Sequence, residues 1–133
     1  MAETFSLIIS MSVNATIGNT TGMATIYDND GVSFANVVKP LLQSNRCTNS
    51  GCHGSGSSSG GFSFGSVSYS TVINASGVNG KIVQANNANS SNMYLKLLSP
   101  PPFGERMPRF GPYLSTLDII KIKDWINQGA QNN

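Results

Sequence analysis

Cys47-Thr48-Asn49-Ser50-Gly51-Cys52-His53 contains both cysteines and the only histidine of this 133-residue chain. Two thiols this close can form a disulfide in an oxidising compartment, which would leave His53 without a role. A structural zinc site needs four ligands and an iron–sulfur cluster usually needs four thiolates, so the segment supplies too few for either. A catalytic cysteine would take its base from elsewhere in the fold, and the chain has no second histidine.

Covalent attachment of haem explains all three side chains. In the pattern C-x-x-C-H, two thiols bond to the vinyl groups of the porphyrin and the following histidine ligates the iron. Here the spacer between Cys47 and Cys52 holds four residues rather than two. Asn49, Ser50 and Gly51 are turn-forming residues that can absorb the added length. The segment therefore favours haem attachment, while a Cys47–Cys52 disulfide stays open.

Length and charge narrow the class of protein. A chain of 133 residues is typical of one domain, or one domain with an appended piece. The formal net charge of +2 is too small for a surface that neutralises nucleic-acid phosphates, so no nucleic-acid partner is expected. No apolar run reaches the length that crosses a bilayer, so no membrane span is expected in this chain.

Helical patterns dominate residues 31–133. Ser33 is a candidate N-cap for a helix over residues 34–46, in which Pro40 should remove a hydrogen bond and bend the axis. A second helix is expected over residues 115–129, with a near capping box at its start and Gly129 at its end.

Shorter elements lie between these helices. One or two helical turns are expected over residues 67–73, and a short helix begins at Ser91-Asn92 and stops before Pro100. The Gly/Ser-rich residues 54–61 predict a flexible loop.

A sixth iron ligand would separate electron transfer from catalysis. With no second histidine in the chain, the candidates are its five methionines. Met93 lies at helical spacing with Leu97, as is typical of a core residue, whereas Met107 sits in the Pro-flanked loop Phe103-Gly104-Glu105-Arg106-Met107-Pro108 and is the favoured ligand. A rigid loop can hold a thioether sulfur against iron at low entropic cost, and thioether ligation raises the reduction potential.

The order of motifs from residue 34 to residue 130 resembles a mono-haem cytochrome c domain of the planctomycete-type group. The residues that carry the resemblance are Val38-Lys39-Pro40-Leu41-Leu42, Cys47, Cys52-His53, Gly60-Gly61-Phe62-Ser63-Phe64, Lys81-Ile82-Val83, Ser91-Asn92-Met93-Tyr94-Leu95, Arg106-Met107-Pro108, Leu114-Ser115 and Trp125-Ile126-Asn127-Gln128-Gly129-Ala130.

This resemblance implies one covalent haem c per chain. Cys47 and Cys52 would form the thioethers, His53 would be the proximal ligand and Met107 the distal ligand to the iron. It also implies attachment on the outer side of a bacterial membrane, hence a periplasmic, cell-surface or extracellular protein. Candidate residues to line the haem pocket are Phe62, Phe64, Tyr94, Leu97, Phe110 and Trp125, and Lys81, Arg106 and Arg109 are candidates to pair with the propionates.

Residues 1–30 read as a β-hairpin arm. Its segments Glu3-Thr4-Phe5 through Ala15-Thr16-Ile17-Gly18 and Gly22-Met23-Ala24-Thr25-Ile26-Tyr27-Asp28-Asn29-Asp30 resemble the last two strands of a Calx-beta repeat. Apolar and polar residues alternate over two stretches that are separated by Gly18-Asn19 and Thr21-Gly22. Such strands could pair with another subunit, giving a homo-oligomer or filament, or they could be the remnant of a domain boundary that packs on its own chain. Asp28 and Asp30 match the region where Calx-beta domains bind calcium.

The expected fold class is thus mainly α: a cytochrome c-like helical haem domain, residues 31–133, after a β-hairpin arm, residues 1–30. The expected function is one-electron transfer to and from redox partner proteins, without enzymatic activity. Two alternatives stay open. One is a peroxidase-like haem enzyme with an open sixth site, and the other is a non-haem adhesive module with a Cys47–Cys52 disulfide.

Overall fold

The computed structural model describes residues 31–133. The chain divides after Asp30 into two units, of which the second, Gly31–Asn133, is the one described. The predicted hairpin arm, its role in assembly and the calcium site at Asp28 and Asp30 therefore lie outside the described residues.

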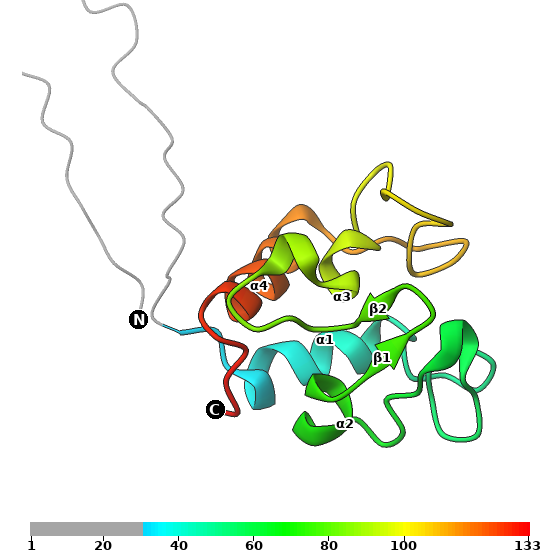
Figure 1. Cartoon of the computed structure of the whole chain (residues 1–133), viewed down its shortest axis with the longest axis horizontal. Helices are drawn as coiled ribbons and strands as arrows, with labels where there is room; N and C mark the ends of the chain where they lie inside the picture. Colours follow the sequence, from blue (N-terminus) through cyan, green and yellow to red (C-terminus); the bar gives the residue numbers. More distant parts are fainter. Residues whose placement is uncertain (1–30) are drawn as a thin grey trace, which may run out of the picture. The chain divides into compact units, whose positions relative to one another are not determined.

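The first helix of the domain has two parts (Figure 1). A π-helical turn, η1, covers Phe34–Val38 and runs directly into α1, Lys39–Ser44. The Ser33 hydroxyl accepts a hydrogen bond from the N–H of Asn36, which confirms the predicted N-cap. Pro40 lies in the first turn of α1, directly after the change from π to α geometry. Pro40 has no N–H to donate, so the helical hydrogen bond is missing at this position, and the change from π to α geometry immediately precedes it.

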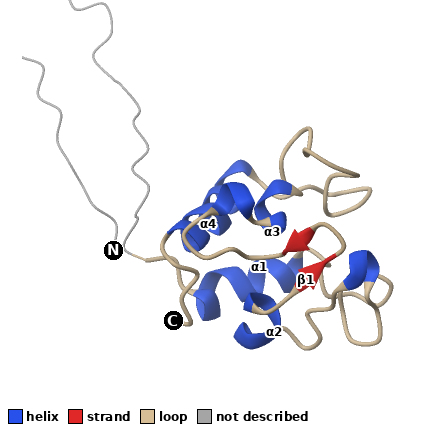
Figure 2. Cartoon of the chain, in the orientation of Figure 1, coloured by secondary structure: helices blue, strands red, loops and turns tan. Residues whose placement is uncertain are grey.

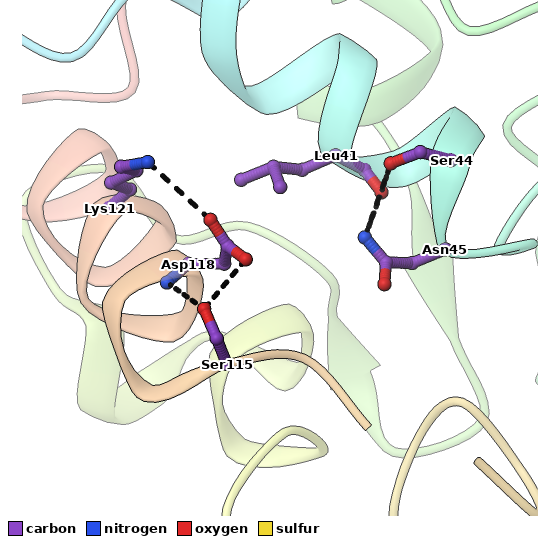
Figure 3. Close-up of polar contacts among 6 residues, drawn as sticks. All are labelled: Leu41, Ser44, Asn45, Ser115, Asp118 and Lys121. Atoms are coloured by element: carbon purple, nitrogen blue, oxygen red, sulfur yellow. Dashed lines mark hydrogen bonds and ion pairs between the residues drawn. The ribbon is translucent and has the colours of Figure 1, made fainter. Parts of the chain in front are cut away.

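The last helix, α4, covers Thr116–Asn127. The Ser115 hydroxyl accepts from the N–H of Asp118 at 3.1 Å and donates to the Asp118 carboxylate at 2.7 Å, while Lys121 pairs with the same carboxylate (Figure 3). Gly129 follows the helix with φ +99°, a conformation that favours glycine, and ends it as predicted. At the end of α1, the Leu41 carbonyl accepts from the side chains of Ser44 and Asn45 (Figure 3).

These two helices meet in the core. The ring of Phe34 from η1 lies 5.6 Å from the ring of Trp125 from α4, measured between centroids. Trp125 is 1 % exposed, and its indole N–H donates to the carbonyl of Gln131. Burial of these two rings joins the start of the domain to its end by an apolar contact. The other large apolar side chains that are fully buried are Val38, Val67, Val72, Val83, Ile122 and Ile126.

Short elements complete the domain (Figure 2). Helix α2 covers Tyr69–Ile73, within the predicted stretch, and α3 covers only Asn92–Leu95 of the stretch predicted to be helical. The antiparallel strands β1, Ser76–Gly77, and β2, Gly80–Lys81, pair as a small hairpin that the sequence does not predict. Single 3-10 turns are η2, Ser59–Gly61, and η3, Ala88–Ser90. Within residues 31–133 no helix has both the length and the apolarity needed to cross a bilayer.

Candidate haem-attachment site

The cysteine and histidine side chains lie on one hydrogen-bonded loop that follows α1. The N–H of Cys47 donates to the carbonyl of Leu42, which ties the first cysteine to the helix. Within the loop, the N–H of Cys52 donates to the carbonyl of Asn49 at 3.0 Å. The N–H of His53 then donates back to the carbonyl of Cys47 at 3.1 Å. The four-residue spacer is therefore folded into a closed loop whose two ends are Cys47 and His53.

The two thiols are free and differ in environment. Cys47 is half-buried against the core, and burial raises the pKa of its thiol to about 11. Its sulfur lies 3.8 Å from the carbonyl oxygen of Asn45. Cys52 is exposed to solvent. Neither thiol is engaged in a disulfide, so both have a sulfur available for another bond.

His53 lies between two aromatic rings. Its imidazole stacks on Phe62, with centroids 4.1 Å apart and planes inclined by 14°, and meets Phe64 edge-on at 5.8 Å. Partial burial of the ring lowers the pKa of His53, an effect that nearby backbone groups of Phe62 and Ser59 oppose in part. Atom Nδ1 of His53 is buried and has no hydrogen-bond partner among the described residues. A histidine used for core packing would be expected to have its buried nitrogen paired, so this ring nitrogen is chemically uncommitted.

The Gly/Ser segment, predicted to be a flexible loop, is instead tied to the cysteine loop. The hydroxyl of Ser57 donates to the carbonyl of Cys52 at 2.8 Å, and that of Ser59 donates to the carbonyl of Gly51 at 3.1 Å. Farther on, the hydroxyl of Ser63 donates to the carbonyl of Gly54 at 2.7 Å. These serines hold the loop by satisfying carbonyls that would otherwise depend on water.

Gly54 allows the spacer to pack closely against His53. A Cβ atom at this position would lie 2.0 Å from the carbonyl oxygen of Thr48. The backbone of the long spacer therefore passes directly over Gly54, at a separation that only glycine permits. Neither Gly54 nor the serines were identified from the sequence, because a Gly/Ser-rich composition alone does not reveal which hydroxyls meet which carbonyls.

Met107 lies on a loop anchored to the end of α3. Its N–H donates to the carbonyl of Lys96 at 2.8 Å, and Nε of Arg106 donates to the carbonyl of Leu97 at 2.9 Å. The Lys96 ammonium in turn donates to the carbonyl of Phe103. Met107 itself is half-buried. In Figure 1 this loop (yellow to orange) and the cysteine loop (teal to green) both lie at the end of the view opposite the C-terminus.

The structure brings only part of the predicted pocket lining to His53. Phe62 and Phe64 contact the imidazole, whereas Trp125 and Leu97 are buried in the core and Tyr94 is partly buried against it. Phe110 is 86 % exposed, with the guanidinium of Arg109 4.9 Å from its ring centroid.

Of the three side chains predicted to pair with the haem propionates, two already interact with other residues and one is exposed to solvent. Arg106 packs over Tyr113 besides donating to the backbone, and Arg109 pairs with Glu105. Lys81 is exposed.

No three Cys, His, Asp or Glu side chains of residues 31–133 converge as a set of ligands for a metal ion. This arrangement gives no support to a zinc site at the cysteine loop, which would require the sulfur and nitrogen atoms to point at one centre. Comparison of the chain with models of known families, with curated proteins and with solved structures finds no match.

Proposed function

We propose that residues 31–133 form a mainly α, cytochrome c-like domain that carries one covalent haem c and transfers single electrons. Cys47 and Cys52 would form the two thioethers, and His53 and Met107 would ligate the iron. The observation that supports this most is the combination, on one closed loop, of two free thiols and a histidine whose buried nitrogen has no partner among residues 31–133. A core histidine or a structural disulfide would leave one part of that combination unexplained.

The residues fit a haem better than a bare metal ion. In haem attachment the sulfurs bond to the edge of the porphyrin and only the histidine ligates the iron, so the three side chains do not need to converge. Phe62 covers one face of the imidazole. A metal bond to a ring nitrogen lies in the plane of the ring, and stacking on the face leaves it available. When bound, the iron would supply the one-electron chemistry, alternating between the ferric and ferrous states.

Side chains of the protein would supply the iron ligands and tune the reduction potential of the haem. The half-buried position of Met107 and its backbone bond to Lys96 support its assignment as the thioether ligand. Thioether ligation and burial both raise the reduction potential. The aromatic rings Phe62 and Phe64 would exclude water from the histidine side of the iron.

The partners and location follow from this proposal. A domain that only accepts and passes on electrons needs redox partner proteins on both sides of the transfer. Haem attachment of this type supports a periplasmic, cell-surface or extracellular location.

Residues 1–30 would mediate a homo-oligomer or filament through donated strands.

Absorption spectra of the oxidised and reduced holoprotein test the function. We expect a low-spin, six-coordinate haem whose ferric form shows the weak long-wavelength band of sulfur ligation. Replacement of Met107 by Ala should abolish that band, whereas Met93→Ala, in the same domain, should leave it in place. A high-spin spectrum in the unaltered protein would contradict electron transfer and favour the enzyme with an open sixth site.

A further inference from the structure

Asn79 lies in the two-residue turn of the β1–β2 hairpin and is followed by Gly80, the first residue of β2, which pairs with Gly77; Asn79 and Gly80 are both exposed to solvent. We infer that Asn79 is a site of spontaneous deamidation, at which this chain changes its own covalent structure without an enzyme. The inference does not depend on haem, because it rests on the hairpin and its contact with α3 alone.

The chemistry needs only water and base. The backbone nitrogen of Gly80, after losing its proton to hydroxide, attacks Cγ of the Asn79 side chain. The bond from Cγ to the side-chain nitrogen breaks and ammonia leaves, which closes a five-membered succinimide. Water then opens this ring at one of its two carbonyls and leaves either aspartate or isoaspartate at position 79. Overall, one water is consumed and one ammonia is released, with no oxidation or reduction.

Three features of the hairpin favour this reaction. Gly80 has no side chain to hinder the attack, and a Cβ added there would meet no atom within 4 Å, so space for the ring exists. The side-chain amide of Asn79 makes no hydrogen bond within the described residues, so nothing there holds it away from the backbone. Only two residue pairs join β1 to β2, Ser76 with Lys81 and Gly77 with Gly80, so the reaction requires the opening of a single pair, Gly77 with Gly80.

The structure also assigns a consequence to the modification. Asn92, the first residue of α3, is 8 % exposed, and its Nδ2 donates to the carbonyls of Asn79 at 3.0 Å and of Gly80 at 3.3 Å. This amide therefore fastens the hairpin to the start of α3. Isoaspartate inserts an additional carbon into the main chain at position 79, which displaces those carbonyls. The buried amide of Asn92 would then lose its acceptors, and a buried donor without a partner is destabilising.

Peptide mass mapping of the full chain, after incubation in mildly alkaline and mildly acidic buffer, tests the inference. We expect Asn79 to convert several-fold faster than Asn74 and Asn89, which are also exposed but precede Ala75 and Ser90. The rate should rise with pH, both aspartate and isoaspartate should form, and Asn79→Gln should abolish the modification at this position. Conversion of Asn79 at the rate of Asn74 or Asn89, or none at all, would overturn the assignment.

A separate measurement of thermal stability tests the contact between the hairpin and α3. The isoaspartate form, separated by chromatography, should unfold at a lower temperature than the unmodified chain. Asn92→Ala should remove most of that difference, because the contact that the modification disrupts is already absent. Equal unfolding temperatures for the two forms of the unaltered chain would overturn the role assigned to Asn92.

Discussion

The imidazole of His53 lies flat against the ring of Phe62, with centroids 4.1 Å apart and planes inclined by 14°. The stack joins the end of the cysteine loop to the segment that follows the Gly/Ser-rich stretch. Phe64 closes the cluster, meeting both rings edge-on. Aromatic packing thus holds the histidine ring, whose Nδ1 makes no hydrogen bond within residues 31–133.

Phe62→Ala should lower the free energy of unfolding by about 1–3 kcal/mol, since it removes a half-buried ring and its two aromatic contacts. Phe110→Ala removes the same atoms from a side chain that is 86 % exposed and should change the stability by less than about 0.5 kcal/mol. Urea unfolding of the two variants measures both values. Equal losses of stability in the two variants would show that the packing of Phe62 against His53 and Phe64 stabilises the domain no more than an exposed ring does.

Gly54→Ala should destabilise the chain by about 1–3 kcal/mol, because the new Cβ would lie 2.0 Å from the carbonyl oxygen of Thr48 and must push the spacer away. Gly56→Ala is the matched control. It has open space around the added carbon but a φ of +77°, so it should cost only the backbone strain of about 1 kcal/mol. Thermal unfolding of both variants makes the comparison. An unfolding temperature for Gly54→Ala at or above that of Gly56→Ala would contradict the close approach.

In protein produced in a host that does not attach haem, the two thiols should differ in their rates of alkylation. The thiolate is the nucleophile, and burial raises the pKa of Cys47 to about 11. Iodoacetamide should therefore label the exposed Cys52 first, and labelling of Cys47 should accelerate as the pH rises toward that value. The single variants Cys47→Ser and Cys52→Ser assign each rate. Faster labelling of Cys47 at neutral pH would contradict its burial.

Ser115→Ala should lower the free energy of unfolding by about 1 kcal/mol, because the N–H of Asp118 loses its cap and α4 carries Trp125 into the core. Ser66→Ala, at an exposed position with no hydrogen bond from its hydroxyl in residues 31–133, should change it by less than about 0.5 kcal/mol. Chemical denaturation is again the measurement. Indistinguishable midpoints would show that the cap adds no stability.

Local signals in the sequence predicted the boundaries that depend on local chemistry. Ser33 and Ser115 cap the helices that follow them, and Gly129 ends the last one, because each acts on backbone groups a few residues away. The helix that begins at Asn92 stops earlier than its apolar pattern predicts. Beyond its end, the carbonyls of Lys96 and Leu97 accept hydrogen bonds from the Met107 loop, a tertiary contact that periodicity does not contain.

The details of the site depend on contacts between residues six to nine positions apart that follow no helix or strand period. The Cys/His segment was found from the residue types alone. Two contacts could not be predicted in this way, because neither leaves a pattern in the sequence. They are the stacking of Phe62 on His53 and the approach of Thr48 to Gly54. The β1–β2 hairpin was missed because its four paired residues include two glycines and no alternation of apolar side chains.

Covalent attachment of haem at Cys47 and Cys52 is the central claim, and it is tested most directly by denaturing the purified chain in alkaline pyridine and recording its reduced spectrum. The chain should come from a host that also matures a known c-type cytochrome. We predict a c-type spectrum that stays with the denatured chain and is lost in the double variant Cys47→Ser/Cys52→Ser. A colourless chain with two titratable thiols, or a pigment that separates from the chain on denaturation, would contradict the claim.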